Sequence, residues 1–117
     1  MFKFIFLFLL SFNCLAEEWT TQDTQRESVY LTLTAIDWNQ TLQGAKQPDH
    51  YYETNIILGS HPSDSRLNTL IPASMLAHYY IATLLPRGYR EAWQYALIVV
   101  EANAVSNNFS IGLSVRF

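Results

Sequence analysis

The stretch LNTLIPASMLAHYYIATLLP, residues 67–86, decides the fold of this chain. It contains no Asp, Glu, Lys or Arg over 20 residues, about the length that an apolar helix needs to cross a bilayer. Pro86 ends the stretch, and Ser63 or Asp64 is placed to cap a helix that begins before it. Pro72 predicts either a kink or the first turn of this helix. We therefore expect a helix that is buried in a bilayer or in a protein core.

Two further helical segments flank this run. Residues 24–43 carry polar side chains at intervals of three and four, which places them on one narrow stripe of a helix. The members of this stripe are Asp23, Glu27, Tyr30, Thr34, Asp37 and Thr41. Residues 92–115 are uncharged except for Glu101, and the short turn 86–90 joins them to the central run. The central and last segments should therefore form an antiparallel hairpin, while Gly, Pro and Asp predict a loop over 44–64.

The two ends of the chain differ from its helical middle. Residues 1–16 match a signal peptide, with Lys3 before an apolar run and a small-residue cleavage site that ends at Ala16. Cys14 also allows acylation as a lipoprotein, although Asn13 stands where that signal needs a small residue. The last nine residues alternate between apolar and polar, which predicts a short extended tail.

Composition favours a membrane-associated helical protein. Half of the residues are hydrophobic and 15% are charged, against about 25% charged residues in ordinary soluble domains. The net charge of −3 argues against nucleic acid as a partner. Cleavage after Ala16 leaves no cysteine, which excludes disulfides and thiolate metal ligands.

We predict an all-α fold, a three-helix bundle that includes an antiparallel hydrophobic hairpin and ends in a short extended C-terminal tail. Residues 17–117 form a single helical membrane-associated domain after the signal peptide 1–16. Membrane lipid is the expected partner, and the bacterial inner membrane or the periplasmic face of the envelope is the expected location. In the alternative, the hairpin is the buried core of a secreted soluble helical domain.

Ionisable residues within the uncharged segments are the candidates for a functional site. Asp37, His78 and Glu101 would each cost about 2.5 to 3.5 kcal/mol in an apolar helix unless they are paired. Imidazole and carboxylate groups suit a metal or proton site, but no HExxH, HxH or ExxH motif is present, and we predict no metal or other cofactor. An interhelical hydrogen-bond network that fixes the helix register explains the same residues.

Two motifs carry a resemblance to other proteins. They are DWxQT, from Asp37 to Thr41, and ExNxILGxHPS, from Glu53 to Ser63. With seven further residues they form a pattern that resembles small, uncharacterised exported or membrane proteins of bacteria. These seven are His78, Leu85, Pro86, Arg90, Trp93, Gln94 and Glu101. Ile56 stands where that pattern has proline. The resemblance implies export and one shared polar centre, and it implies no reaction.

These residues together form the predicted polar cluster, a candidate for structure or ligand binding. Its members are Asp37, Gln40, Glu53, Asn55, His61, His78, Arg90, Gln94 and Glu101. The sequence predicts a small envelope membrane protein that uses this cluster for structure or ligand binding. A membrane-embedded enzyme or proton-linked accessory, with Asp37, His78 and Glu101 as acid, base or ligands, is one alternative. A secreted helical interaction module is the other.

Overall fold

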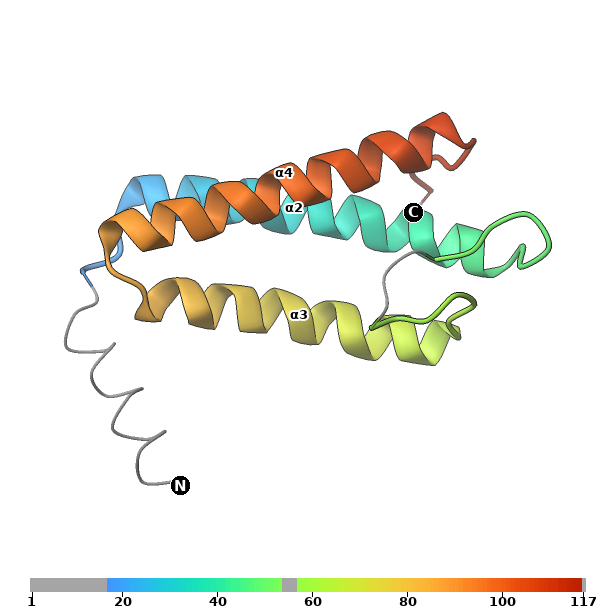
Figure 1. Ribbon diagram of the computed structural model, residues 1–117, viewed down its shortest axis with the longest axis horizontal. Helices are drawn as coiled ribbons and strands as arrows, with labels where there is room; N and C mark the ends of the chain where they lie inside the picture. The colour runs from blue at the N-terminus through green and yellow to red at the C-terminus, as the bar shows by residue number, and fades with distance from the viewer. Residues whose placement is uncertain (1–16, 54–56, 117) are drawn as a thin grey trace, which may run out of the picture.

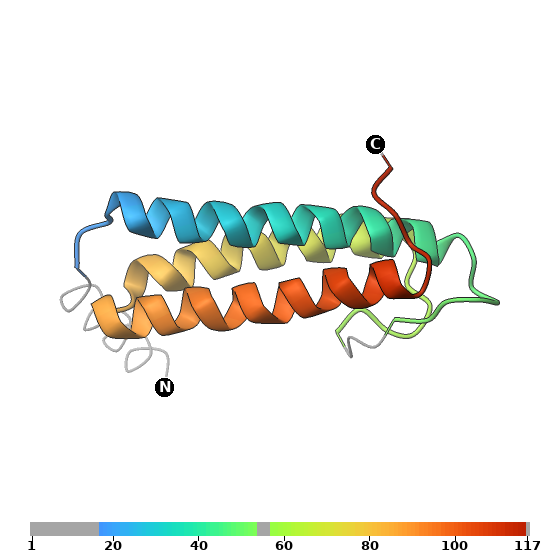
Figure 2. The same cartoon turned by 90° about the horizontal axis from the view of Figure 1, so that it is seen from above.

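The structure is a computed structural model that describes residues 17–53 and 57–116. Its three helices are α2 (Thr21–Ala45), α3 (Asp64–Leu84) and α4 (Arg87–Ser110), and the described ranges contain no strand. The helices run side by side and pack as a bundle (Figures 1 and 2). The predicted all-α, three-helix architecture is confirmed. The predicted signal peptide, 1–16, lies outside the described residues.

Short-range signals determine where the helices begin. Thr20 forms a capping box at the start of α2: its Oγ1 accepts from the backbone N–H of Asp23, and its own N–H donates to Asp23 Oδ2. Ser63 caps α3 as the sequence predicts, because its Oγ accepts from the backbone N–H of Arg66. Pro86 directly precedes α4, so the turn between α3 and α4 is tighter than the predicted one.

The packing of the three helices is uneven. α2 packs most extensively against α4, less against α3, and α3 touches α4 least. The turn between α3 and α4 and the start of α2 lie at one end of the bundle (Figure 1). The loop after α2 and the residues after α4 lie at the other end (Figures 1 and 2). The segments that flank the helices therefore gather at two opposite ends of the bundle.

The interior of the bundle combines polar and apolar side chains in similar numbers. Its buried apolar cluster is small and consists of Leu58, Leu67 and Ile71, with Trp38 and Met75 packed against it. The buried polar side chains are Asp23, Glu27, Thr34, Gln40, His78, Arg90 and Gln94. The polar stripe of α2 faces the partner helices.

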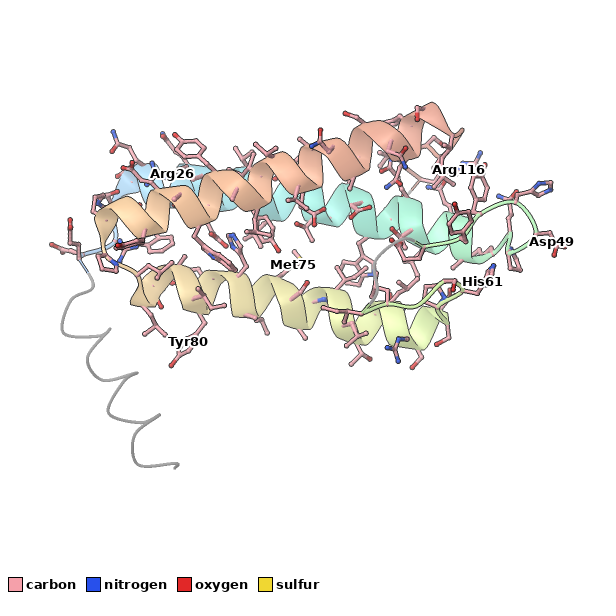
Figure 3. All side chains as sticks on the ribbon, viewed as in Figure 1. Arg26, Asp49, His61, Met75, Tyr80 and Arg116 are labelled. Atoms are coloured by element: carbon pink, nitrogen blue, oxygen red, sulfur yellow. The ribbon has the colours of Figure 1, made fainter. Side chains whose placement is uncertain are left out.

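Large apolar side chains lie on the outside of the bundle. Leu76 on α3 is 72% exposed, and Val99 on α4 is 58% exposed. Tyr80 of α3 points away from the other two helices (Figure 3). The usual distribution of apolar residues inside and polar residues outside is thus partly reversed in this bundle.

The prediction of a transmembrane hairpin is wrong. Within the described ranges, no helix combines the length and the apolar character that crossing a membrane requires. The prediction treated a lack of charge as hydrophobicity, but Asn68, Ser74 and His78 make α3 considerably more polar than a membrane span. The inner-membrane location that was inferred from the hairpin is wrong for the same reason.

The alternating C-terminal segment does not form a strand within residues 109–116. The helix α4 extends to Ser110, and the chain then continues without regular secondary structure. Gln43 of α2 donates a hydrogen bond to the backbone carbonyl of Ser114, and Asn39 Oδ1 accepts one from the backbone N–H of Arg116 at 2.8 Å. Side chains of α2 therefore hold the tail in place of a neighbouring strand.

Candidate functional site

Buried polar residues form two clusters at different places along α2. The first, called the arginine cluster below, contains Asp23, Arg26, Glu27, His78, Arg87, Arg90 and Gln94. The second, called the carboxyl cluster, contains Asp37, Gln40, Thr41, Glu101 and Asn108. Arg26 of the first cluster and His61, which lies beside the second, appear at opposite ends of the bundle (Figure 3).

Asp23 is the centre of the arginine cluster. Its side chain is fully buried, and its two oxygens accept from Arg26 at 2.5 Å, Arg87 at 2.6 Å and Arg90 at 2.9 Å. Burial raises the pKa of Asp23, but hydrogen bonds from Arg87, Thr20 and Arg90 outweigh it and hold the pKa well below its usual range. Three guanidinium groups therefore neutralise one buried carboxylate.

Arg90 joins three parts of the chain. Its side chain is 1% exposed, and its Nε donates to the backbone carbonyl of Ala82 at 2.8 Å. Its Nη2 donates to the backbone carbonyl of Glu17 at 2.6 Å, and the guanidinium lies 5.3 Å from the ring centroid of Trp19. Arg90 therefore fastens α4 to the end of α3 and to the residues before α2, which is a structural role.

A chain of hydrogen bonds extends from Arg26 to His78. Gln94 Oε1 accepts from Arg26 Nε at 2.8 Å, and Gln94 Nε2 donates to Glu27 Oε1 at 3.2 Å. The other oxygen of Glu27 lies 2.8 Å from His78 Nδ1. These contacts link all three helices through buried side chains, so they fix the register of the bundle.

His78 lies between two aromatic rings. The Tyr30 ring stacks on one side with a centroid distance of 3.6 Å, and the Trp93 ring stacks on the other at 5.2 Å. The indole N–H of Trp93 donates to the backbone carbonyl of His78 at 3.1 Å. His78 Nε2 is buried and has no hydrogen-bond partner among the described residues.

The carboxyl cluster consists of groups from α2 and α4. Glu101 hydrogen-bonds Asp37, and Asn108 Nδ2 donates to Asp37 Oδ1 at 2.7 Å and to Gln40 Oε1 at 3.1 Å. Thr41 Oγ1 donates to Asp37 Oδ1 at 3.3 Å. These donors are neutral, which is the main difference from the arginine cluster.

Glu101 carries a proton at neutral pH. Burial raises its pKa, the hydrogen bond and charge of Asp37 and the charge of Glu53 raise it further, and the pKa reaches about 8. Within the described residues, two buried atoms of this cluster, Gln40 Nε2 and Glu101 Oε2, have no hydrogen-bond partner. The cluster can therefore hold or release a proton near neutral pH, and it retains one donor and one acceptor for a further polar group.

A pocket opens beside the carboxyl cluster. It has a volume of about 550 Å³ with its open mouth included. Loop residues form one side of it and the ends of α2 and α4 form the other; they include Thr41, Gly44, Tyr51, Tyr52, Glu53, Ser60, His61, Asn107 and Asn108. Thr41 and Asn108 belong to both the pocket and the carboxyl cluster. A ligand in the pocket would therefore lie one side chain away from the buried carboxyl pair.

The structure divides the nine residues of the predicted polar cluster into separate groups. His78, Arg90 and Gln94 lie in the arginine cluster, and Asp37, Gln40 and Glu101 lie in the carboxyl cluster. Glu53 and His61 line the pocket, and Asn55 lies outside the described residues. The hydrogen-bond partner of His78 is Glu27, so the predicted triad of Asp37, His78 and Glu101 does not form a single centre.

Sequence reasoning missed several members of both clusters. Asp23 and Glu27 were recognised as part of the polar stripe but not as site residues, although they are its first two members. Asn108 was not among the predicted site residues, whereas in the structure it bridges Asp37 and Gln40. Within the described ranges, no group of three or more His, Cys, Asp or Glu side chains is arranged to hold a metal ion.

Comparisons with protein-family models, with curated proteins and with solved structures found no match to this chain. The resemblance drawn from the DWxQT and ExNxILGxHPS motifs stays a prediction. The geometry of the two clusters and of the pocket is therefore the basis for the functional proposal.

Proposed function

We propose that this chain is a binding protein for a small polar ligand, which it takes up in the pocket beside the carboxyl cluster. The observation that supports this is the double role of Asn108. Its side chain lines the pocket and also donates to Asp37 at 2.7 Å, so the pocket wall is in direct contact with a protonatable carboxyl pair. A concave site with a few converging polar groups and a shifted pKa is typical of ligand-binding sites.

The arginine cluster supports the proposal by contrast. Its buried carboxylate, Asp23, already accepts from three arginines, and Arg90 and Gln94 are both buried. Such a network of buried ion pairs stabilises the helix arrangement, and none of its residues lines the pocket. We therefore assign the register of the bundle to the arginine cluster and ligand binding to the other end.

The proposal is tested with a substitution at an exposed position of α4 that fills the mouth of the pocket. Asn107 is exposed and lines the pocket, so Asn107→Trp places an indole in its mouth. Asn103 is exposed on the same helix and does not line the pocket, so Asn103→Trp is the matched control. The melting temperatures of the wild type and of both variants are measured with and without each compound of a panel of small amines, polyols, amino acids and carboxylates. Each compound is present at 10 mM, a concentration on the order of a weak dissociation constant.

At least one compound of the panel is expected to raise the melting temperature of the wild type and of Asn103→Trp and to leave that of Asn107→Trp unchanged. If every compound acts equally on the two tryptophan variants, the pocket is not a binding site and the proposal fails.

A further inference from the structure

One side of the bundle carries exposed apolar side chains from both α3 and α4. On α3, His78 points toward α2, where it contacts Glu27 and Tyr30. Leu76 and Tyr80 lie two residues before and after His78, about 200° around the helix, so they face away from α2. Their exposed fractions are 72% and 58%, and Tyr80 points outward in Figure 3.

The outer side of α4 is arranged in the same way. Gln94 and Glu101 hydrogen-bond side chains of α2. Ala96 and Val99 each lie two residues from one of them and therefore on the opposite side of α4, where both are exposed. Because α3 and α4 both pack mainly against α2, their sides that face away from α2 adjoin each other. We call this surface the α3/α4 face; its members are Leu76, Tyr80, Ile81, Ala96, Val99 and Val100.

The α3/α4 face is also the part of the helical surface without charge. No Asp, Glu, Lys or Arg occurs between Arg66, in the first turn of α3, and Arg87, which begins α4. The charged residues of α4 lie in its first five positions, except for Glu101, which is directed toward α2. The ends of the two helices therefore carry their charges, and the middle of the face carries none.

The exposed side of α2 has a different character. Its exposed residues include Gln22, Gln25, Ser28 and Thr32, which are polar, while Val29 stands alone as a large apolar side chain at 48% exposure. Single exposed apolar residues are common on protein surfaces, whereas a contiguous apolar patch indicates an interaction site. The patch is thus confined to α3 and α4.

The area of the α3/α4 face fits that of a protein interface. With about 150 Å² on a fully exposed large side chain, its six members expose on the order of 500 Å² of apolar surface. A standard interface buries about 800 Å² per partner, of which about 55 to 65% is apolar, or roughly the same 500 Å².

We infer that the α3/α4 face is the interface through which two copies of this chain form a symmetric dimer. A two-fold dimer places the same surface of each copy against the other, so any charge on it meets a like charge or needs an exact counterpart. Each copy has a net charge of −3, and an uncharged face lets two such copies meet without repulsion across the contact.

A lipid surface fits this face less well. Helices that bind to anionic membranes carry Lys and Arg beside their apolar residues. Neither α3 between Arg66 and its end nor α4 beyond Arg90 contains Lys or Arg. The inference is separate from the proposed ligand binding, because none of the six residues of the face lines the pocket.

The experiment measures self-association of the full chain by sedimentation velocity at concentrations from about 1 to 100 µM, which span weak and moderate protein affinities. The first variant carries Leu76→Glu and Val99→Glu, which put two negative charges on the face. The second carries Leu76→Gln and Val99→Gln, which remove apolar surface without adding charge. Val29→Glu on α2 is the matched control, because it also replaces an exposed apolar residue with a charge. Circular dichroism melts confirm that each variant is folded.

We expect the wild type and Val29→Glu to form dimers with the same dissociation constant, of about 10 µM or below. The double glutamate variant should raise this constant at least a hundredfold, since like charges meet across the interface. The double glutamine variant should raise it at least tenfold. Flotation with vesicles of phosphatidylcholine and phosphatidylglycerol should leave the wild type in the protein fraction.

Three outcomes overturn the inference. If the wild type stays monomeric over the whole concentration range and does not float with vesicles, the face is not a dimer interface. If it stays monomeric and floats with vesicles, the occupant of the face is lipid. If it dimerises but both double variants dimerise as tightly as Val29→Glu, two copies meet through another surface. Ligand binding in the pocket is tested separately and survives each of these results.

Discussion

At the scale of single residues, the two carboxyl groups at the centres of the clusters respond to burial in opposite ways. Glu101 lies beside two other acidic groups, Asp37 and Glu53, and its pKa rises. Asp23 lies among arginines, and its pKa falls. Burial acts in the same direction on both, so the charge of the neighbours decides the sign of the net shift.

Glu101 should make the protein less stable as pH rises. Its pKa is about 8 in the folded chain and 4.5 for an unperturbed glutamate, so between these values the folded state holds a proton that the unfolded state has lost. Its contribution to the free energy of unfolding therefore falls from pH 5 to pH 8. We expect Glu101→Gln to remove this slope and to be more stable than the wild type at pH 8, by about 2 kcal/mol.

Urea denaturation at several pH values measures this effect. Glu91→Gln on the same helix, where the side chain is 45% exposed, is the control and should keep the wild-type slope. A Glu101→Gln variant with the same dependence on pH as the wild type would contradict the prediction.

Asp23→Asn should destabilise the protein strongly, because it leaves the buried Arg90 and its neighbours without a negative partner. Removing one partner from a buried ion pair costs about 3 to 5 kcal/mol. The pKa of Asp23 is lowered in the folded chain, so its contribution is present above the pKa of the unfolded state and is lost as pH falls below it. Denaturant unfolding of the wild type and of Asp23→Asn at pH 7 and pH 3 should therefore show a difference in the free energy of unfolding that is smaller at pH 3.

The control for this prediction is Asp49→Asn, in an exposed loop position, which should change the free energy of unfolding by less than about 0.5 kcal/mol.

At the scale of elements, the sequence predicts what depends on short spacing. The intervals of three and four between Glu27, Tyr30 and Thr34 predicted one stripe along α2, which is buried in the structure, and Ser63 was one of two expected caps of α3. It could not show which charges meet across the bundle. Asp23 contacts Arg87 and Arg90, more than 60 residues away, and periodicity within one helix carries no information about such pairs. The hairpin itself was predicted correctly, whereas its membrane-spanning role was inferred from missing charges and was wrong.

The capping box at the start of α2 should contribute measurably to stability. Thr20→Ala removes the side-chain oxygen that accepts from the Asp23 N–H, and the loss of such a cap costs about 1 kcal/mol. Thr21 is exposed at the first position of the helix, so Thr21→Ala serves as the control and should be nearly neutral. Thermal unfolding of the two variants tests the prediction, which fails if their melting temperatures agree.

At the scale of the whole molecule, the reversed distribution of apolar and polar side chains should change the thermodynamics of unfolding. Apolar surface that becomes exposed raises the heat capacity of the chain, and polar surface lowers it. Much of the buried interior is polar, while Leu76 and Val99 are already exposed in the folded monomer. Differential scanning calorimetry of the monomer should therefore give a heat-capacity change below the usual 12 to 15 cal/mol/K per residue, at about 10 or less. A value within or above the usual range would show that the interior is more apolar in solution than these contacts indicate.

The stack of Tyr30, His78 and Trp93 gives the molecule an optical reporter of its own. The emission of an indole depends on the groups that pack against it, and the ring of Trp93 lies 5.2 Å from that of His78. Trp19 and Trp38 lie elsewhere, next to Arg90 and Asn68, so phenylalanine at both positions leaves Trp93 as the one tryptophan of the chain. Changes in the emission of Trp93 would then follow the packing of α4 against α3 at His78 in real time, without any label attached to the chain.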